Sequence, residues 1–321
     1  MHLDHILGNV TTGHAGVLRS YLDEPVDQPS DWEQEELVNY VNLEHRHLFS
    51  VVRGFNEDWF GRVYVFPITS GVQEYYLPMD CVNPRRLEII KATSVSGSAP
   101  NLVVNESTAG PLEVDEITLN EKMSVRHSMV NTSFEAGFGY YLFDDKIVFE
   151  PSSSLNSSVY GRLFYSPQAP DLHRGIAQSG GVNTITLANV AATETVGEPR
   201  KIDNYYQGMR IEIILGPGVG QLKRIVSYDG TTQVATVESN WSTQPDATSH
   251  YSIVSPIQED YHELMVLGAA LRAKGIKVED DTTGIGAVYM ALRSDMDNAL
   301  EKRNQQSNRR VVATSGRAGW F

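Results

Sequence analysis

The stretch from Ser30 to Gly54 constrains the fold most, because it predicts one long amphipathic helix. Ser30 and Glu33 have the spacing of a capping box, in which each side chain satisfies a free backbone N–H of the first turn. Gly54 is the expected stop. The apolar stripe contains Leu37, Val41, Leu48, Val52 and Phe55, and the opposite face carries Asn39, Asn42, His45, Arg46 and Arg53. Such a helix is marginal alone, so the stripe must pack on other helices.

The packing partners of this helix are predicted near the other end of the chain. One helical segment follows Pro256 and ends near Gly275, and a second runs from about Ile285 to Arg303. Each has an apolar stripe, so the three helices are predicted to form one layer. The residues expected to pack there, within one chain or between copies in a ring, are Leu37, Val41, Leu48, Val52, Leu264, Leu267, Leu271, Val288 and Leu292.

Between these helices the hydrophobic period changes to two, which predicts β-strands. A hairpin is indicated where Gly139–Phe143 and Lys146–Glu150 flank Asp144-Asp145. Pro67 places its strand at an edge or at a strand end, because proline cannot donate to the ladder. The other expected strands are 62–68, 72–77, 85–91, 102–104, 117–119 and 159–165, with a loop at 93–100.

Residues 177–256 are predicted to form a separate all-β module, because turn signals recur at the spacing typical of sandwiches. A hairpin is expected at Asp229-Gly230. Gly216 and Gly220 do not form a phosphate-binding loop, because that motif requires a lysine and a helix after its second glycine. Here Gln221 and a strand follow instead.

Together these patterns predict an α+β fold. A helical layer of N- and C-terminal helices and an antiparallel β-subdomain form a body made of residues 1–176 and 257–306. The all-β domain, sandwich-like or barrel-like, is inserted at 177–256, and residues 307–321 form an extended C-terminal segment.

Composition argues against several classes of function. A net charge of −14 over 321 residues is unfavourable for wrapping nucleic acid. The single cysteine, Cys81, excludes an internal disulfide and suits a reducing cytoplasm. The sequence predicts no membrane span and no signal peptide. His262 and Glu263 lack the second histidine of the H-E-x-x-H metal motif, and no carboxylates pair at a recognisable catalytic spacing. No catalytic residue, cofactor or metal ligand is therefore predicted.

The C-terminal segment is predicted to dock on a partner. It has no helical period, and burying its two terminal aromatic side chains does not offset the entropy lost on ordering it. β-strand addition to another subunit would supply the missing backbone hydrogen bonds. The alternative is that the segment folds back on its own domain. The expected docking residues are Arg309, Arg310, Val311, Val312, Arg317, Trp320 and Phe321.

Two motifs lie among these elements. A strand ends in Tyr75-Tyr76-Leu77-Pro78-Met79-Asp80, of the form Tyr-x-Leu-Pro-x-Asp, and the hairpin ends in Lys146–Pro151, of the form x-Ile-x-Phe-x-Pro. With the capped helix and Asp58-Trp59-Phe60, this order resembles the head-to-tail adaptor (neck, or gatekeeper-type) proteins of tailed bacteriophages. The resemblance covers roughly 30–170 and 257–305, and the block 218–225 with Trp241 is similar to a β-module of phage structural and fibre proteins.

The resemblance implies a structural virion protein at the head-tail junction, assembled in the bacterial cytoplasm. Such a protein forms a homo-oligomeric ring of dodecameric size below the portal, connects capsid to tail, and lets DNA pass during genome ejection without binding it specifically. The implied partners are the portal protein, held by the C-terminal segment, and a tail nozzle, tube or fibre protein. Two alternatives remain open: a tail-fibre or baseplate binding module, and a carbohydrate-active enzyme such as a glycan hydrolase.

Overall fold

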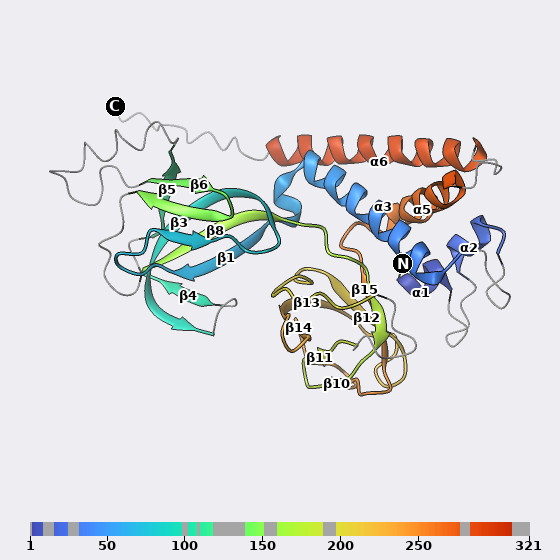
Figure 1. Ribbon diagram of the computed structural model, residues 1–321, viewed down its shortest axis with the longest axis horizontal. Coiled ribbons are helices and arrows are strands. Elements are labelled where there is room, and N and C mark those ends of the chain that lie inside the picture. The colour runs from blue at the N-terminus through green and yellow to red at the C-terminus, as the bar shows by residue number, and fades with distance from the viewer. Residues whose placement is uncertain are drawn as a thin grey trace, which may run out of the picture. The chain divides into compact units, whose positions relative to one another are not determined.

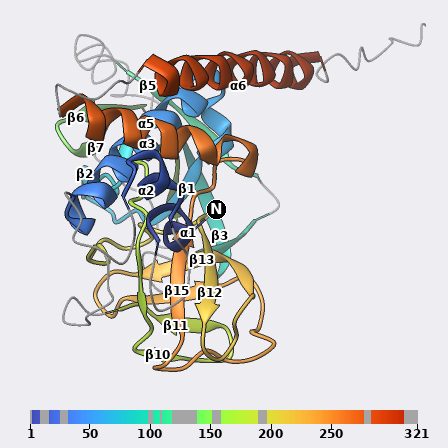
Figure 2. The same cartoon turned by 90° about the vertical axis from the view of Figure 1, so that its right-hand side faces the viewer.

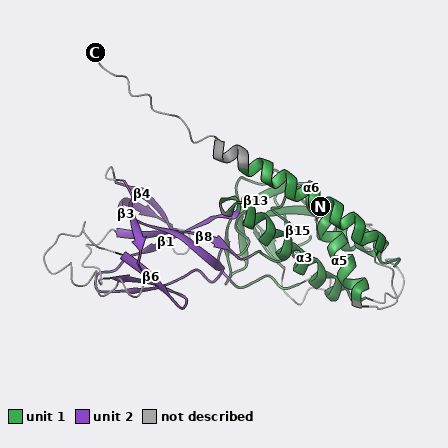
Figure 3. Ribbon diagram, turned by 90° about the horizontal axis from the view of Figure 1, so that it is seen from above, with its two compact units in different colours: residues 1–59, 169–201, 205–321 green, residues 60–168, 202–204 purple. Residues whose placement is uncertain are grey.

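The computed structural model describes residues 2–8, 16–24, 32–97, 102–107, 110–117, 139–150, 159–188, 197–276 and 283–309, with only the backbone described at 305–309. The fold mixes helices and strands, as predicted. The chain divides into two compact units (Figure 3). Unit 1 comprises 1–59, 169–201 and 205–321, and unit 2 comprises 60–168 and 202–204.

Unit 1 contains the helices from both ends of the chain (Figure 1). They are α1 (Leu3–Leu7), α2 (Val17–Tyr21), α3 (Gln34–Phe55), α5 (His262–Ile276) and α6 (Thr283–Arg309). The 3-10 turns η1 (Glu57–Phe60) and η3 (Glu259–Tyr261) follow α3 and precede α5. α3 packs on α5, and α6 contacts both (Figures 1 and 2). Helices that are remote in sequence therefore share one layer.

Helix α3 begins later and ends later than predicted. Its N-cap is Glu33, which has extended backbone and makes no side-chain capping bond, so the predicted capping box does not start this helix. Ser30 lies outside the described residues. Gly54 lies inside the helix, which ends where the backbone of Asn56 becomes extended. The first turn carries Glu35 and Glu36, and their negative charges interact favourably with the helix dipole, as expected.

The strands of unit 1 form one antiparallel sheet, seven-stranded over the described residues, in the order β10-β11-β14-β13-β12-β15-β9. The predicted hairpin at Asp229-Gly230 is confirmed, because β13 and β14 pair there and the Asp229 carboxylate accepts the N–H groups of Thr231 and Thr232. The strands are β9 (Arg174–Ile176), β10 (Ser179–Gly180), β11 (Thr184–Thr186), β12 (Arg210–Leu215), β13 (Leu222–Asp229), β14 (Val234–Val237) and β15 (His250–Val254).

Unit 2 is built on a second sheet, which has eight strands within its described ranges. The order is β1-β8-β3-β5-β6-β7-β2, with β4 paired to β3. The core of this unit includes Leu87, Ile147, Phe149 and Leu163, all buried. The strands are β1 (Arg62–Pro67), β2 (Glu74–Tyr76), β3 (Cys81–Ser96), β4 (Val103–Glu106), β5 (Leu112–Glu116), β6 (Gly139–Phe143), β7 (Lys146–Glu150) and β8 (Val159–Pro167).

Two sequence predictions for unit 2 are confirmed. Phe143 pairs with Lys146 across the predicted hairpin, and Asp144 adopts the positive φ of 57° that a tight turn requires. Strand β1, which contains Pro67, is an edge strand of the sheet. Both predictions succeeded because they rest on local backbone chemistry.

Two predictions for unit 2 are wrong. The sheet is mixed rather than antiparallel, because β5 and β6 pair in parallel, with Asp115 opposite Gly139. Part of the expected loop 93–100 is strand, since β3 continues to Ser96 where β4 pairs with it. Of the strand expected at 117–119, residue 117 follows the end of β5 at Glu116, and residues 118–119 lie outside the described residues. Each error concerns which strand a segment pairs with, and the local pattern does not specify that partner.

Helix α6 continues to Arg309, beyond the predicted end at Arg303. The added residues, 304–309, include two glutamines and an arginine, which are good helix formers. Arg309, expected in an extended docking segment, is therefore the last residue of a helix. The other expected docking residues lie outside the described residues: Arg310, Val311, Val312, Arg317, Trp320 and Phe321.

The compact units divide the chain differently from the expected domains. The sheet of unit 1 already includes β9, before residue 177. The helices also bond to this sheet or to its end, since the N–H of Leu3 donates to the Ser252 hydroxyl over 3.2 Å and His45 lies 3.0 Å from the Ser255 hydroxyl. That 177–256 folds as an independent inserted domain stays a prediction.

Candidate functional site

The residues predicted to pack in the helical layer have three degrees of burial. Leu271 and Leu292 are half-buried, and Val288 is 48% exposed. In place of Val288, α6 buries Met296 and Leu300, and Met290 is 67% exposed. The buried residues are Leu37, Val41, Leu48, Val52, Leu264 and Leu267. The first half of α6 therefore presents two apolar side chains, Val288 and Met290, that the described residues leave exposed.

A buried carboxylate ties the three long helices together. Glu44 of α3 accepts hydrogen bonds from Arg272 of α5, over 2.9 Å to Nη2, and from the Tyr289 hydroxyl of α6, over 2.6 Å. His47 lies 3.1 Å from the same carboxylate. Burial by itself raises the pKa of Glu44, but the bonds from Tyr289, His47 and Arg272 outweigh it and hold the pKa below its usual range. Glu44 is therefore a charged anchor for α6.

Gly268 of α5 leaves the space that Glu44 occupies, and replacing it tests the anchor. A Cβ at residue 268 would lie 2.4 Å from Cδ of Glu44, whose position is fixed by its partners. We expect Gly268→Ala to lower stability, because overpacking of about 1–3 kcal/mol exceeds the gain of about 1 kcal/mol in helix propensity. Urea unfolding of the two variants is the measurement. Gly275→Ala is the matched control, since nothing lies within 4 Å of its new Cβ, and it should be neutral or stabilising. Equal stabilisation by both variants would contradict the anchor.

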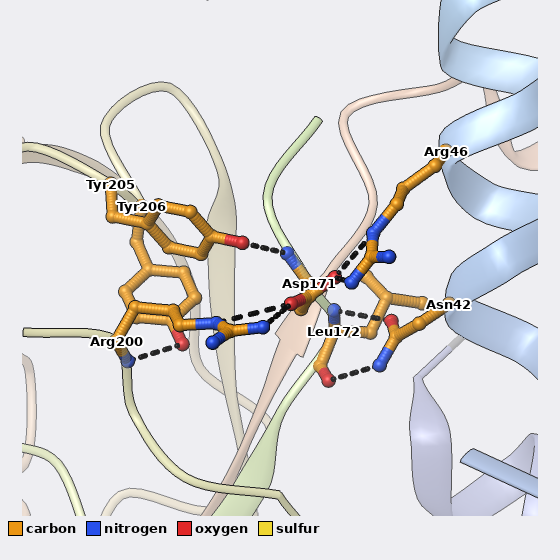
Figure 4. Close-up of polar contacts among 7 residues, drawn as sticks. All are labelled: Asn42, Arg46, Asp171, Leu172, Arg200, Tyr205 and Tyr206. Carbon is orange, nitrogen blue, oxygen red and sulfur yellow. Dashed lines mark hydrogen bonds and ion pairs between the residues drawn. The ribbon is translucent and has the colours of Figure 1, made fainter. Parts of the chain in front are cut away.

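A second cluster surrounds Asp171 and joins α3 to residues 197–201, which we call the strap (Figure 4). Arg46 of α3 donates from Nε to Oδ1 over 2.8 Å, and Arg200 of the strap donates from Nη2 to Oδ2 over 2.9 Å. The Asn42 side chain pairs with the backbone of Leu172, accepting its N–H over 2.7 Å and donating to its carbonyl over 3.3 Å. One helix face thus fixes this segment through both side chain and backbone.

Tyrosines hold the strap from its other side. The Tyr206 hydroxyl accepts the N–H of Arg200 over 3.3 Å, and the Tyr228 hydroxyl donates to the backbone carbonyl of Arg200 over 2.9 Å. The Tyr205 hydroxyl accepts the N–H of Asp171 over 3.1 Å (Figure 4). Tyr206 and Tyr228 are fully buried. The strap therefore has a fixed backbone beside Asp171.

A pocket of about 490 Å³ opens in this cluster. Its volume falls in the range of small-molecule sites. The walls come from α3, from residues 171–173, from the strap and from Tyr206. Its polar lining includes Asn39, Asn42, Arg46, Asp171, His173, Arg200 and Lys201. Every lining residue belongs to unit 1.

The sequence analysis missed this site. It placed Asn42 and His45 on the solvent face of α3, whereas both are buried. The reason is that α3 is covered by α5 and also by two segments of the chain, one carrying Leu172 before β9 and one carrying Ser255 after β15. The only local signal was the spacing of Val38, Asn42 and Arg46, which puts them on one helix face.

The closest approach to a catalytic pair in this unit is His45 with Ser255, whose Nε2 and Oγ atoms are 3.0 Å apart. Both residues are fully buried, and the Ser255 hydroxyl accepts the N–H of Ile257 over 3.2 Å. Burial lowers the pKa of His45 to about 4. Asp171, the carboxylate that acts on this imidazole, is already bound by two arginines. The geometry is that of a structural hydrogen bond in a closed core.

In unit 2, Asp80 ends the Tyr-x-Leu-Pro-x-Asp motif, and its carboxylate is buried. It accepts a hydrogen bond from the Tyr165 hydroxyl over 3.0 Å and pairs with Arg62. Arg62 also donates to the carbonyl of Asn204 over 2.8 Å. Burial and the negative charge of Asp80 raise the pKa of the Cys81 thiol to about 12. Asp80 is therefore the centre of a buried ionic network.

The described residues hold no group of three or more histidine, cysteine or acidic side chains placed to bind a metal. Within the same ranges no helix is both long and apolar enough to span a membrane. No protein-family model matches the sequence, and no curated protein matches it either. The function is therefore inferred from the contacts, exposure and charge of the described residues.

Proposed function

We propose that this chain is a structural virion protein, a head-to-tail adaptor that forms a ring below the portal, connects capsid to tail and lets DNA pass. The observation that carries the proposal is the exposure of two large apolar side chains on α6, Val288 and Met290, which the described residues leave 48% and 67% exposed. Exposed apolar side chains on a long helix are typical of a surface that meets another subunit. Copies of the same chain would cover it in a closed ring.

Two further features support this function. α3, α5 and α6 pack together although they come from opposite ends of the chain, and the strands between them form two sheets. This agrees with the order of elements on which the resemblance to phage adaptors rests. A net charge of −14 suits a ring through which a polyanion passes without adhering. In this proposal the inserted β-module, 177–256, contacts a tail nozzle, tube or fibre protein.

The assembly is tested by the native mass of the purified protein, alone and with the portal protein of the same virion. We expect a large closed ring, alone or on the portal. The double variant Val288→Glu and Met290→Glu should shift the mass to the monomer. A control variant, Val219→Glu, changes a valine that is 61% exposed outside the helices and should leave the mass unchanged. A trimer would favour a tail-fibre module instead, and a monomer under every condition would refute the ring.

The C-terminal segment has its own test, because deletion of residues 308–321 removes all of the predicted docking residues. We expect the truncated protein to keep its fold, since Asn304 still donates to the carbonyl of Phe55 over 2.8 Å and anchors α6. Attachment to the portal, measured by co-sedimentation, should be lost. Unchanged attachment would contradict docking through this segment, whatever the oligomeric state.

A further inference from the structure

The pocket beside α3 contains a buried hydrogen-bond donor that lacks an acceptor. His173 is buried and its Nδ1 lies 3.1 Å from the Tyr251 hydroxyl, which in turn accepts the N–H of Ala188 over 2.7 Å. The hydroxyl can donate its hydrogen to Nδ1, and the ring hydrogen is then on Nε2. Among the described residues, Nε2 has no hydrogen-bond partner. Buried polar groups of this kind are uncommon, and an unseen ligand is one explanation.

The ring edge that carries Nε2 belongs to the pocket. His173 lines it, and the adjacent ring atom Cδ2 faces Gly197 of the strap, where a Cβ would lie 3.7 Å away. Burial lowers the pKa of His173 to about 3, so the imidazole is neutral at pH 7. Nε2 therefore offers an uncharged N–H donor to anything that enters.

The rest of the lining supplies positive charge. Arg46 and Arg200 bind Asp171 through Nε and Nη2, and Arg200 also interacts with the side chain of Tyr205. Lys201 stands at the rim, 70% exposed, and lies 3.7 Å from Glu198. Three cations face two carboxylates, a surplus of +1, whereas the whole chain carries −14. The pocket is thus a local positive site in an acidic protein.

We propose that this pocket binds a small oxyanion, a carboxylate or phosphate group of a low-molecular-weight ligand. The oxyanion accepts hydrogen bonds from Nε2 of His173 and from the guanidinium groups of Arg46 and Arg200, which are donors suited to such anions. Binding satisfies the buried N–H and neutralises the charge surplus in one step. Because the walls are α3 and the strap, the ligand also ties these two segments together. The inference is independent of the proposed ring.

Titration of the full-length, ¹⁵N-labelled protein at pH 7 tests the site directly. The ring ¹⁵N signals of His173 are followed while sodium phosphate or sodium succinate is added, with sodium chloride at matched ionic strength as the control. We expect a saturable shift at millimolar concentrations with phosphate, with succinate, or with both, and none with chloride. The effective anion identifies the phosphate or carboxylate class. No shift with either oxyanion, or an equal shift with chloride, would overturn the proposal.

Matched variants assign the effect to the pocket. Arg200→Gln should weaken binding at least tenfold, because it removes the surplus charge and one donor. Lys223→Gln changes a lysine outside the pocket, bonded to Ser239, and should leave the affinity unchanged. The fluorescence of the buried Trp241 checks that each variant is folded. If Arg200→Gln fails to fold, Lys201→Gln at the exposed rim replaces it, and two- to threefold weakening is expected. Undiminished binding by the folded variant contradicts the assignment.

Discussion

Lowering the pH from about 6.5 to 4 is expected to destabilise unit 1 by several kcal/mol. His45, His173 and His262 are buried, and burial lowers the pKa values of His45 and His262 to about 4 and of His173 to about 3. In the unfolded chain each titrates near about 6.5. Between these values the unfolded state binds protons that the folded state does not, so stability falls as the pH falls. The loss is on the order of 2–3 kcal/mol for each imidazole.

The summed loss is comparable with the total stability of a domain, roughly 5–15 kcal/mol. Unit 1 should therefore unfold as the pH approaches about 4. Below about pH 4.5 the low pKa of Glu44 acts in the same direction, because protonation weakens its bonds to α5 and α6. Tryptophan fluorescence during urea unfolding follows unit 1, since residues 60–168 contain no tryptophan. The slope of the free energy of unfolding against pH should correspond to the uptake of nearly three protons on unfolding.

Single-residue variants test the assignment of this slope. His262→Gln should remove about one proton from the slope, because a neutral amide does not titrate. His250→Gln, at the half-buried first residue of β15, is the control for replacing a histidine as such. A slope below one proton in the wild type between pH 6.5 and 4 would show that these imidazoles are not buried in solution.

Asp80→Ala is expected to have the largest effect of any single substitution in unit 2, about 3–5 kcal/mol. Removing the carboxylate takes the Asp80 ion pair from the buried guanidinium of Arg62 and the acceptor from the Tyr165 hydroxyl. Hydrogen exchange at amides of β3 and β8 measures the loss, because these strands pair along most of their length. Tryptophan fluorescence should change much less, since unit 1 holds the tryptophans.

Two controls separate lost charge pairing from lost packing. Glu74→Ala breaks the exposed pair with Lys146, 2.8 Å long, and should change exchange only slightly. The double variant Asp80→Leu with Arg62→Met replaces both charges by apolar groups and should recover much of the stability. If the double variant is as unstable as Asp80→Ala, the cost comes from shape rather than from an unpaired charge.

Features of the fold were predicted correctly from the sequence where they depend on interactions between residues close together in the chain. The β6–β7 hairpin and the edge position of Pro67 follow from turn geometry and from the missing N–H of proline, which act within a few residues. The start of α3 was wrong because Glu33, without a side-chain cap, takes the N-cap position. The parallel pair β5–β6 was missed because period-two patterning does not specify a partner strand.

The candidate site shows the same division. Asn42 and His45 read as solvent-facing on a helical wheel, yet they are buried because Leu172 and Ser255 cover that side of α3. No local pattern relates Arg46 to Asp171 or to Arg200, which lie far apart along the chain. The pocket exists only where these three segments meet.

By itself, the sequence determined that long helices near both ends of the chain flank two regions of β-structure. The reason is that the hydrophobic periods of helices and strands can be recognised from residues close together in the sequence. Tertiary structure alone decided which polar side chains are buried. Glu44 lies at a helix junction that Gly268 leaves open, and His173 carries a ring N–H that faces a pocket. The physical reason is that the cost of burying a polar group depends on partners that only the folded chain brings within hydrogen-bonding distance.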